Sequence, residues 1–129
     1  MAKVQKKKVT RNTDKTVYLI EQIIEGMREK KAANIIQLDL TKISNRVADY
    51  YLVCSADNIR QVSAIADSIE DFTTRFCEEK PWHVEGLTNS QWVLMDYVNV
   101  VVHVFETEAR EFYGIEDLWA DAILTKIKD

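Results

Sequence analysis

The stretch NSQWVLMDYVNVVVHVF, residues 89–105, predicts a β-hairpin and decides the fold class of this 129-residue chain. Two runs of β-branched and large apolar residues flank a short break, which is typical of two paired strands. If Val98-Asn99 is a two-residue turn, the strand positions pair in a single register. The expected pairs are Asp96 with Val101, Leu94 with His103, and Trp92 with Phe105.

The two faces of this hairpin differ in character, because successive side chains of a strand point to opposite faces. One face is almost entirely aliphatic and predicts a core beneath helices; it carries Val93, Met95, Tyr97, Val100, Val102 and Val104. The other face is mixed aromatic and polar, as interaction patches are; it carries Trp92, Leu94, Asp96, Val101, His103 and Phe105. The register stays open, because Val98 disfavours a positive φ and a one-residue shift exchanges the faces of the second strand.

The rest of the chain predicts helices and strands around this hairpin. Periodicity and capping residues place two long helices, one from a cap at Asn12 or Thr13 and one from a cap at Asp57 or Asn58 to just before Pro81. Short strands are expected at 35–38, 50–54 and 82–84, and short helices at 107–113 and 115–123. We therefore expect one α/β domain, with a mixed five-stranded sheet, the two long helices on one face, and short C-terminal helices.

The composition indicates a soluble intracellular domain. With 47% hydrophobic residues the chain can form a globular core, and no apolar run approaches the ~20 residues that span a bilayer. The basic N-terminus lacks the apolar segment of a signal peptide. Cys54 and Cys77 form no CxxC motif, which favours free thiols in a reducing compartment. We expect a cytoplasmic protein with no membrane contact.

Charge is distributed unevenly along the chain. Residues 1–15 carry six lysines and arginines against one aspartate, a net charge of +5, whereas the whole chain carries −4. We interpret residues 1–12 as a basic, disordered arm and residues 13–123 as the folded domain. An acidic domain with a basic arm suits a partner that combines basic protein with a polyanion. The alternative is a solvated segment that only helps solubility.

The candidate catalytic and metal-binding residues do not assemble into a known kind of site. Asp96 and His103 are expected to be diagonal neighbours, but no nucleophile and no Gly-rich turn accompany them. Cys54 and His103 could imitate a Cys–His pair, although a lone thiol at a strand end is more often a core residue. His83 and His103 lack the clustered partners of a metal site. Asp49 has no second acid beside it and is expected to bond loop amides. We expect no enzyme activity, no cofactor and no metal.

Three blocks of the sequence carry a family resemblance. They are ADYYLVCS at 48–55, VEG at 84–86 with Trp92 six residues later, and WVLMDYVNVVVHVFETEAREFYGIEDLWADA at 92–122. Together they resemble the ribosomal silencing factor family, also called RsfS or Iojap, over roughly residues 14–122. At the hairpin tip that family usually shows Gly-Asp, where this chain has Val98-Asn99.

The resemblance implies a non-catalytic, nucleotidyltransferase-like α/β fold and a translation repressor. Family members bind ribosomal protein fourteen of the large subunit and block joining of the small subunit under nutrient limitation. Alternatives are a large-subunit assembly factor, or a nucleotide-binding enzyme of the same fold. The basic arm is expected to contact ribosomal RNA, and the free chain could form a homodimer. The contact residues implied are Trp92 and Tyr97, with Glu85, Leu94, Asp96 and His103 as further candidates.

Overall fold

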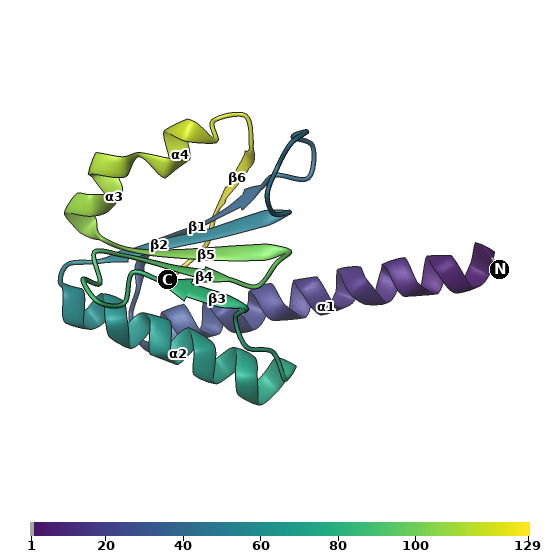
Figure 1. The fold of residues 1–129 in the computed structure, drawn as a ribbon, viewed down its shortest axis with the longest axis horizontal. Coiled ribbons are helices and arrows are strands. Elements are labelled where there is room, and N and C mark those ends of the chain that lie inside the picture. Colours follow the sequence, from purple (N-terminus) through teal and green to yellow (C-terminus); the bar gives the residue numbers. More distant parts are fainter. Residues whose placement is uncertain (1) are drawn as a thin grey trace.

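A mixed six-stranded sheet forms the centre of the computed structural model, with helices on both of its faces (Figure 1). The structure describes residues 2–129, and the side chains of residues 14–129. The arm predicted at 1–12 lies outside the described side chains and stays a prediction. The helix start predicted at Asn12 or Thr13 is wrong, because the first helix already begins at Ala2 and runs through both positions. In chain order the elements are α1 (Ala2–Glu29), β1 (Ala33–Asp39), β2 (Tyr50–Ala56), α2 (Ile59–Cys77), β3 (His83–Glu85), β4 (Trp92–Asp96), β5 (Val100–Glu106), α3 (Thr107–Tyr113), α4 (Ile115–Leu118) and β6 (Ile123–Lys126).

The strand order across the sheet is β3-β4-β5-β2-β1-β6. The central pair β2–β5 is parallel and the remaining pairs are antiparallel, which makes the sheet mixed as predicted. Helices α1 and α2 lie together on one face, and α3 and α4 lie on the other (Figure 1). The α/β fold class and the placement of the two long helices are therefore confirmed.

The prediction of a helix over 115–123 and of only five strands is wrong. Helix α4 ends at Leu118, and Ile123–Lys126 instead form β6, which pairs with β1 at the edge of the sheet. All four residues of β6 are exposed. Without a buried face the strand has no two-residue alternation of apolar residues, so only its pairing with a distant strand defines it.

The β4–β5 hairpin adopts the predicted register, with the three expected pairs in place. Tyr97 N donates to Val100 O at 2.8 Å, which closes the turn around Val98 and Asn99. Val98 takes a φ of +78°, a strained value for a β-branched residue. Its backbone N–H donates to Asp96 Oδ1 at 2.7 Å, and this bond helps to hold the turn.

An aliphatic core fills the space between the sheet and the two long helices. Its helical members recur at three- and four-residue spacing along α1 and α2. The two helices approach closely at Gly26, where a Cβ atom would lie 2.8 Å from Ile69 Cα. Ser68 Oγ donates to Gly26 O at 2.8 Å across this contact. No helix in the described part of the chain is long and apolar enough to cross a membrane.

Helix α2 begins and ends where the sequence predicts. Asn58, one of the two predicted caps, accepts from Gln61 N at 2.9 Å through its side-chain oxygen. The helix ends at Cys77 because Glu78 turns into the left-handed region with a φ of +55°. This helix covers the face of the hairpin that carries Tyr97.

Candidate partner-binding surface

An aromatic cluster lies on the sheet face opposite α1 and α2. The indole of Trp92 stacks on Phe105 with ring centroids 4.9 Å apart and reaches Tyr113 of α3 at 4.8 Å. Tyr51 contacts His103 edge-on at 4.6 Å and Trp119 at 5.8 Å. The members of this aromatic cluster are Tyr51, Trp92, His103, Phe105, Tyr113 and Trp119. It joins β2, β4 and β5 to the segment that carries α3 and α4.

His103 is the polar centre of this cluster. Its Nδ1 accepts a hydrogen bond from Trp92 Nε1 at 3.0 Å. Burial lowers the pKa of His103 to about 4, so the ring is neutral at pH 7. With Nδ1 accepting, the ring proton resides on Nε2. That nitrogen is buried without a hydrogen-bond partner among the described residues. The Trp92–His103 hydrogen bond therefore fixes the orientation of the indole, while His103 Nε2 has no hydrogen-bond partner.

The prediction that this face is an open patch presenting His103 is wrong. The side chain is 3% exposed, because α3, α4 and the residues around them cover the centre of the face. Ile115 and Trp119 pack over the sheet there. Trp92 and Leu94 remain partly exposed at the margin. On the hairpin, the open part of this face is thus its β3–β4 side.

The prediction that Tyr97 presents its ring to a partner is also wrong. Tyr97 is 4% exposed and belongs to the aliphatic core. Its hydroxyl lies 2.8 Å from Thr73 Oγ1 of α2, and burial raises its pKa. Strand alternation explains this position, because Tyr97 shares the inward face with Met95. Tyr97 fastens the hairpin to α2 and does not reach the surface.

Two acidic candidates lie at the margin of the aromatic face. Glu85 is exposed on the edge strand β3, and its Oε2 lies 3.4 Å from His83 Nε2. Leu94 is the cross-strand partner of Glu85 and of His103, so all three share one face. Asp96 is partly exposed, and one of its oxygens is occupied by the turn. These residues extend the exposed margin toward the edge of the sheet.

The chain has further exposed aromatic side chains on α3 that the sequence interpretation missed. Phe112 is 83% exposed and Tyr113 is 47% exposed, and their rings meet edge-on at 5.1 Å. Through Tyr113 this pair is continuous with Trp92. We call Trp92, Leu94, Phe112 and Tyr113 the docking surface. The sequence does indicate this exposure. Phe112 and Tyr113 are consecutive in a seven-residue helix and point about 100° apart, so both rings cannot face the core.

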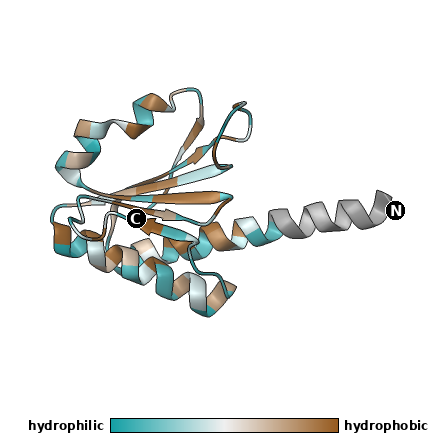
Figure 2. Cartoon of the chain, viewed as in Figure 1, coloured by the Kyte–Doolittle hydropathy of each residue, from teal (hydrophilic) through white to brown (hydrophobic). Residues whose placement is uncertain are grey.

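The segment around the docking surface is acidic. Residues 107–122 contain five aspartates and glutamates against the single basic residue Arg110. Figure 2 shows α3 and α4 as a mixture of hydrophilic and hydrophobic residues, in contrast to the more uniformly hydrophobic strands. Exposed aromatic rings among carboxylates are suited to contact a basic protein surface.

The family model described as "Ribosomal silencing factor during starvation" matches residues 13–129. The chain belongs to this family. The ribosomal silencing factor of Bacillus subtilis (strain 168) is 41% identical over 102 residues, which cover 77% of this chain and 82% of that protein. That of Halalkalibacterium halodurans is 34% identical over 107 residues, which cover 81% of this chain and 87% of that protein.

Solved structures agree with the assignment to the ribosomal silencing factor family. A crystal structure of a Chromobacterium violaceum protein superposes with a TM-score of 0.75 at 32% identity, covering 80% of this chain and 84% of that chain. A Bacillus halodurans crystal structure gives a TM-score of 0.71 at 28% identity, covering 87% and 98%. The fold and the family resemblance are thereby confirmed.

In this ribosomal silencing factor family member, the residues considered for catalysis are separated. Cys54 faces the aliphatic core and His103 the aromatic cluster, so the sheet lies between them. Burial raises the pKa of the Cys54 thiol to about 12, which keeps it protonated at pH 7. Asp49 Oδ1 accepts from Arg46 Nε at 3.0 Å and not from loop amides as predicted. Among the described residues, no three His, Cys, Asp or Glu side chains are grouped to hold a metal ion.

Proposed function

We propose that this chain binds the large ribosomal subunit through ribosomal protein fourteen and sterically prevents the small subunit from joining. Membership of the ribosomal silencing factor family supports the ribosome as the target. The observation that carries the proposal is the docking surface, on which Phe112 and Tyr113 expose aromatic rings beside Trp92. We infer that the chain acts by occupying a surface and not by catalysis.

The chemistry of the docking surface fits a basic protein partner. Tyr and Trp are common anchors of protein interfaces, and truncating such an anchor typically costs about 2 kcal/mol or more. The carboxylates of α3 and α4 attract a positively charged ribosomal protein and speed association. In this proposal Glu85 and Asp96 extend the acidic rim on the other side of Trp92. His103 contributes indirectly, by holding the Trp92 indole in place.

The experiment compares two phenylalanine variants of the full chain. Phe112→Ala removes an 83% exposed ring from the docking surface, and Phe76→Ala removes a 48% exposed ring from α2 on the opposite side of the sheet. Co-sedimentation with isolated large subunits should show about thirtyfold weaker binding for Phe112→Ala. Subunit joining in a translation extract should recover to the same degree. Phe76→Ala should behave like the unmodified chain.

Phe112 contributes little to the core, so Phe112→Ala should fold normally and a change in binding can be assigned to the surface. A Phe112→Ala chain that folds, binds large subunits with unchanged affinity and still blocks joining would place the contact elsewhere. Equal losses in both variants would indicate a nonspecific effect of removing exposed rings. Circular dichroism of both variants establishes that they are folded.

A second candidate function is assembly of the large subunit. A mouse protein named "Mitochondrial assembly of ribosomal large subunit protein 1" is 24% identical over 102 residues, covering 78% of this chain and 44% of that protein. In an assembly role the chain would bind through the same surface, but to a large subunit that is still being assembled. Cells that lack the chain should then accumulate incomplete large subunits, whereas loss of a repressor leaves large subunits complete. Gradient fractionation of such cells, with the protein content of each peak, separates the two.

We also propose that the basic arm of residues 1–12 contacts ribosomal RNA, and that the free chain self-associates through the docking surface. Contacts between lysines and phosphates weaken with salt. Deleting the arm should therefore flatten the salt dependence of large-subunit binding. Sedimentation velocity of the unmodified chain and Phe112→Ala tests self-association.

A further inference from the structure

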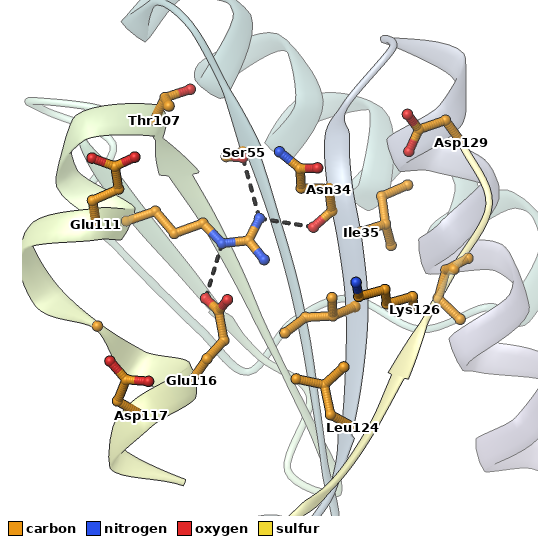
Figure 3. Close-up of a pocket in the computed structure, with 14 residues that line it drawn as sticks. Asn34, Ile35, Ser55, Thr107, Glu111, Glu116, Asp117, Leu124, Lys126 and Asp129 are labelled. Carbon is orange, nitrogen blue, oxygen red and sulfur yellow. Dashed lines mark hydrogen bonds and ion pairs between the residues drawn. The ribbon is translucent and has the colours of Figure 1, made fainter. Parts of the chain in front are cut away.

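A cavity of about 630 Å³ lies between α3–α4 and the β1–β6 edge of the sheet (Figure 3). Its volume falls within the ~300–1,000 Å³ range of small-molecule sites. None of the four docking-surface residues lines it. Helix α3 turns Arg110 and Glu111 toward the cavity, while Phe112 and Tyr113 belong to the docking surface. The cavity is therefore a second site, separate from the proposed partner contact.

Arg110 lines the cavity, and its guanidinium still has hydrogen-bond donors without an acceptor. Its side chain is 11% exposed. Nε donates to Glu116 Oε1 at 2.9 Å, and Nη1 donates to Asn34 O at 2.7 Å and Ser55 Oγ at 3.2 Å. In Figure 3 Glu116, Asn34 and Ser55 converge on this group. Nη2 has no acceptor among the described residues, although it carries two N–H donors. An anionic oxygen from a ligand would satisfy them with a charge-assisted bond.

The sheet side of the cavity supplies a second cation. Lys126 extends from the edge strand β6, and Figure 3 shows its side-chain nitrogen turned toward the cavity. It forms no ion pair with another residue in the described part of the chain. Arg110 and Lys126 thus border one region of the cavity in which an anionic group can sit.

The helix side of the cavity carries the opposite charge. Glu111 and Asp117 line it, are exposed, and have no ion-pair partner among the side chains described. Glu116 is different, since it already neutralises Arg110. Asp129 also lines the cavity, near the end of the chain after β6, so free carboxylates lie on both sides of it, while the cations come from Arg110 of α3 and Lys126 of β6. A ligand complementary to this arrangement carries a carboxylate at one end and a positive group at the other.

We propose that this cavity binds a small cationic zwitterion, with its carboxylate at Arg110 and Lys126 and its positive group at Glu111 and Asp117. A free basic amino acid and the basic C-terminal residue of a short peptide share this chemistry. Since the site lies apart from the docking surface, the inference does not depend on the proposed function.

Calorimetric titration of the full chain tests the proposal with probes that each lack one feature. L-Arginine carries a carboxylate and a distant guanidinium, agmatine lacks the carboxylate, and L-norvaline lacks the guanidinium and keeps only the α-ammonium next to its carboxylate. Glycyl-L-arginine represents a peptide C-terminus. We expect saturable binding of L-arginine or glycyl-L-arginine, and at least tenfold weaker binding of agmatine and L-norvaline. The tighter of the first two probes identifies the source of the ligand.

Two exposed residues allow matched variants that leave the Arg110 network intact. Lys126→Ala and Asp117→Asn should each weaken binding at least tenfold. The controls are Lys128→Ala and Asp121→Asn, which change the same residue types outside the cavity lining and should leave binding unchanged. Absence of saturable binding for both L-arginine and glycyl-L-arginine overturns the proposal. So does equal binding of agmatine, or an equal loss in the control variants.

Discussion

The two faces of the sheet are packed in different ways. On the α1–α2 side, two long helices cover an almost wholly aliphatic core. Its buried residues come from β1, β2, β4 and β5 as well as from the two helices. On the α3–α4 side, two short helices cover only the centre of an aromatic face. Trp92 and Tyr113 are left at its margin. The longer helices therefore close one face of the sheet completely, whereas the shorter helices leave aromatic rings of the other face exposed to solvent.

The polar groups follow the same division. The aliphatic face buries the Tyr97 hydroxyl, which is paired with Thr73. The aromatic face buries His103 with one nitrogen bonded to Trp92 and the other unpaired. An unpaired buried donor costs about 1–3 kcal/mol. The face that carries the docking surface is thus the less optimised of the two.

The largest expected difference between the faces is in stability. Ile65 is fully buried in the aliphatic core, and Ile65→Ala should lower the free energy of unfolding by about 2–5 kcal/mol. Phe112→Ala on the other side should change it by less than about 0.5 kcal/mol, because that ring is mostly in solvent. Urea titrations followed by circular dichroism measure both. Equal losses would mean that α3 is part of the core and would remove the contrast between the faces.

The aromatic face should also make stability depend on pH. His103 has a pKa of about 4 in the fold, compared with 6.5 without burial. As the pH falls from about 6.5 to 4, the unfolded chain takes up a proton that the folded chain does not. The free energy of unfolding should therefore decrease by up to about 3 kcal/mol over this window, and stay unaffected by His103 above it.

The control for this pH dependence is His103→Leu, which keeps His83 and all carboxylates. Its free energy of unfolding should fall less steeply between pH 6.5 and 4.5 than that of the unmodified chain. Ile65→Ala should shift the whole curve without changing its slope. Identical slopes for the unmodified chain and His103→Leu would show that the histidine is not buried in neutral form.

The smallest expected effect concerns the Trp92–His103 hydrogen bond. Trp92→Phe keeps a ring beside Phe105 but leaves Nδ1 of the buried histidine without its donor, which should cost about 1–3 kcal/mol. In a His103→Leu background the same change should cost less, because no polar partner remains. A double-mutant cycle on unfolding free energies measures this coupling, expected at about 1 kcal/mol. Additive losses would show that the bond does not couple the two side chains.

Residue alternation in the strands and periodicity in the helices predicted much of the fold. The sequence left the hairpin register open at Val98, and the structure shows the register of a two-residue turn, which keeps the aliphatic face buried. At Tyr97 two sequence arguments disagreed: alternation placed it in the core, whereas the family resemblance placed it at a partner contact. The structure agrees with alternation. Strand β6 was not predictable in this way, since all of its side chains are exposed.

The sequence by itself determined the α/β class, the two long helices and the family, because these depend on local patterns and on matching motifs. Only the tertiary structure decided which part of the aromatic face stays open. That depends on how α3 and α4 fold back over the sheet, on the pairing of β6 with β1, and on the contacts of Arg110 with Asn34 and Ser55. These contacts join residues far apart in the chain, and the energy of such a contact appears only once both partners are in place.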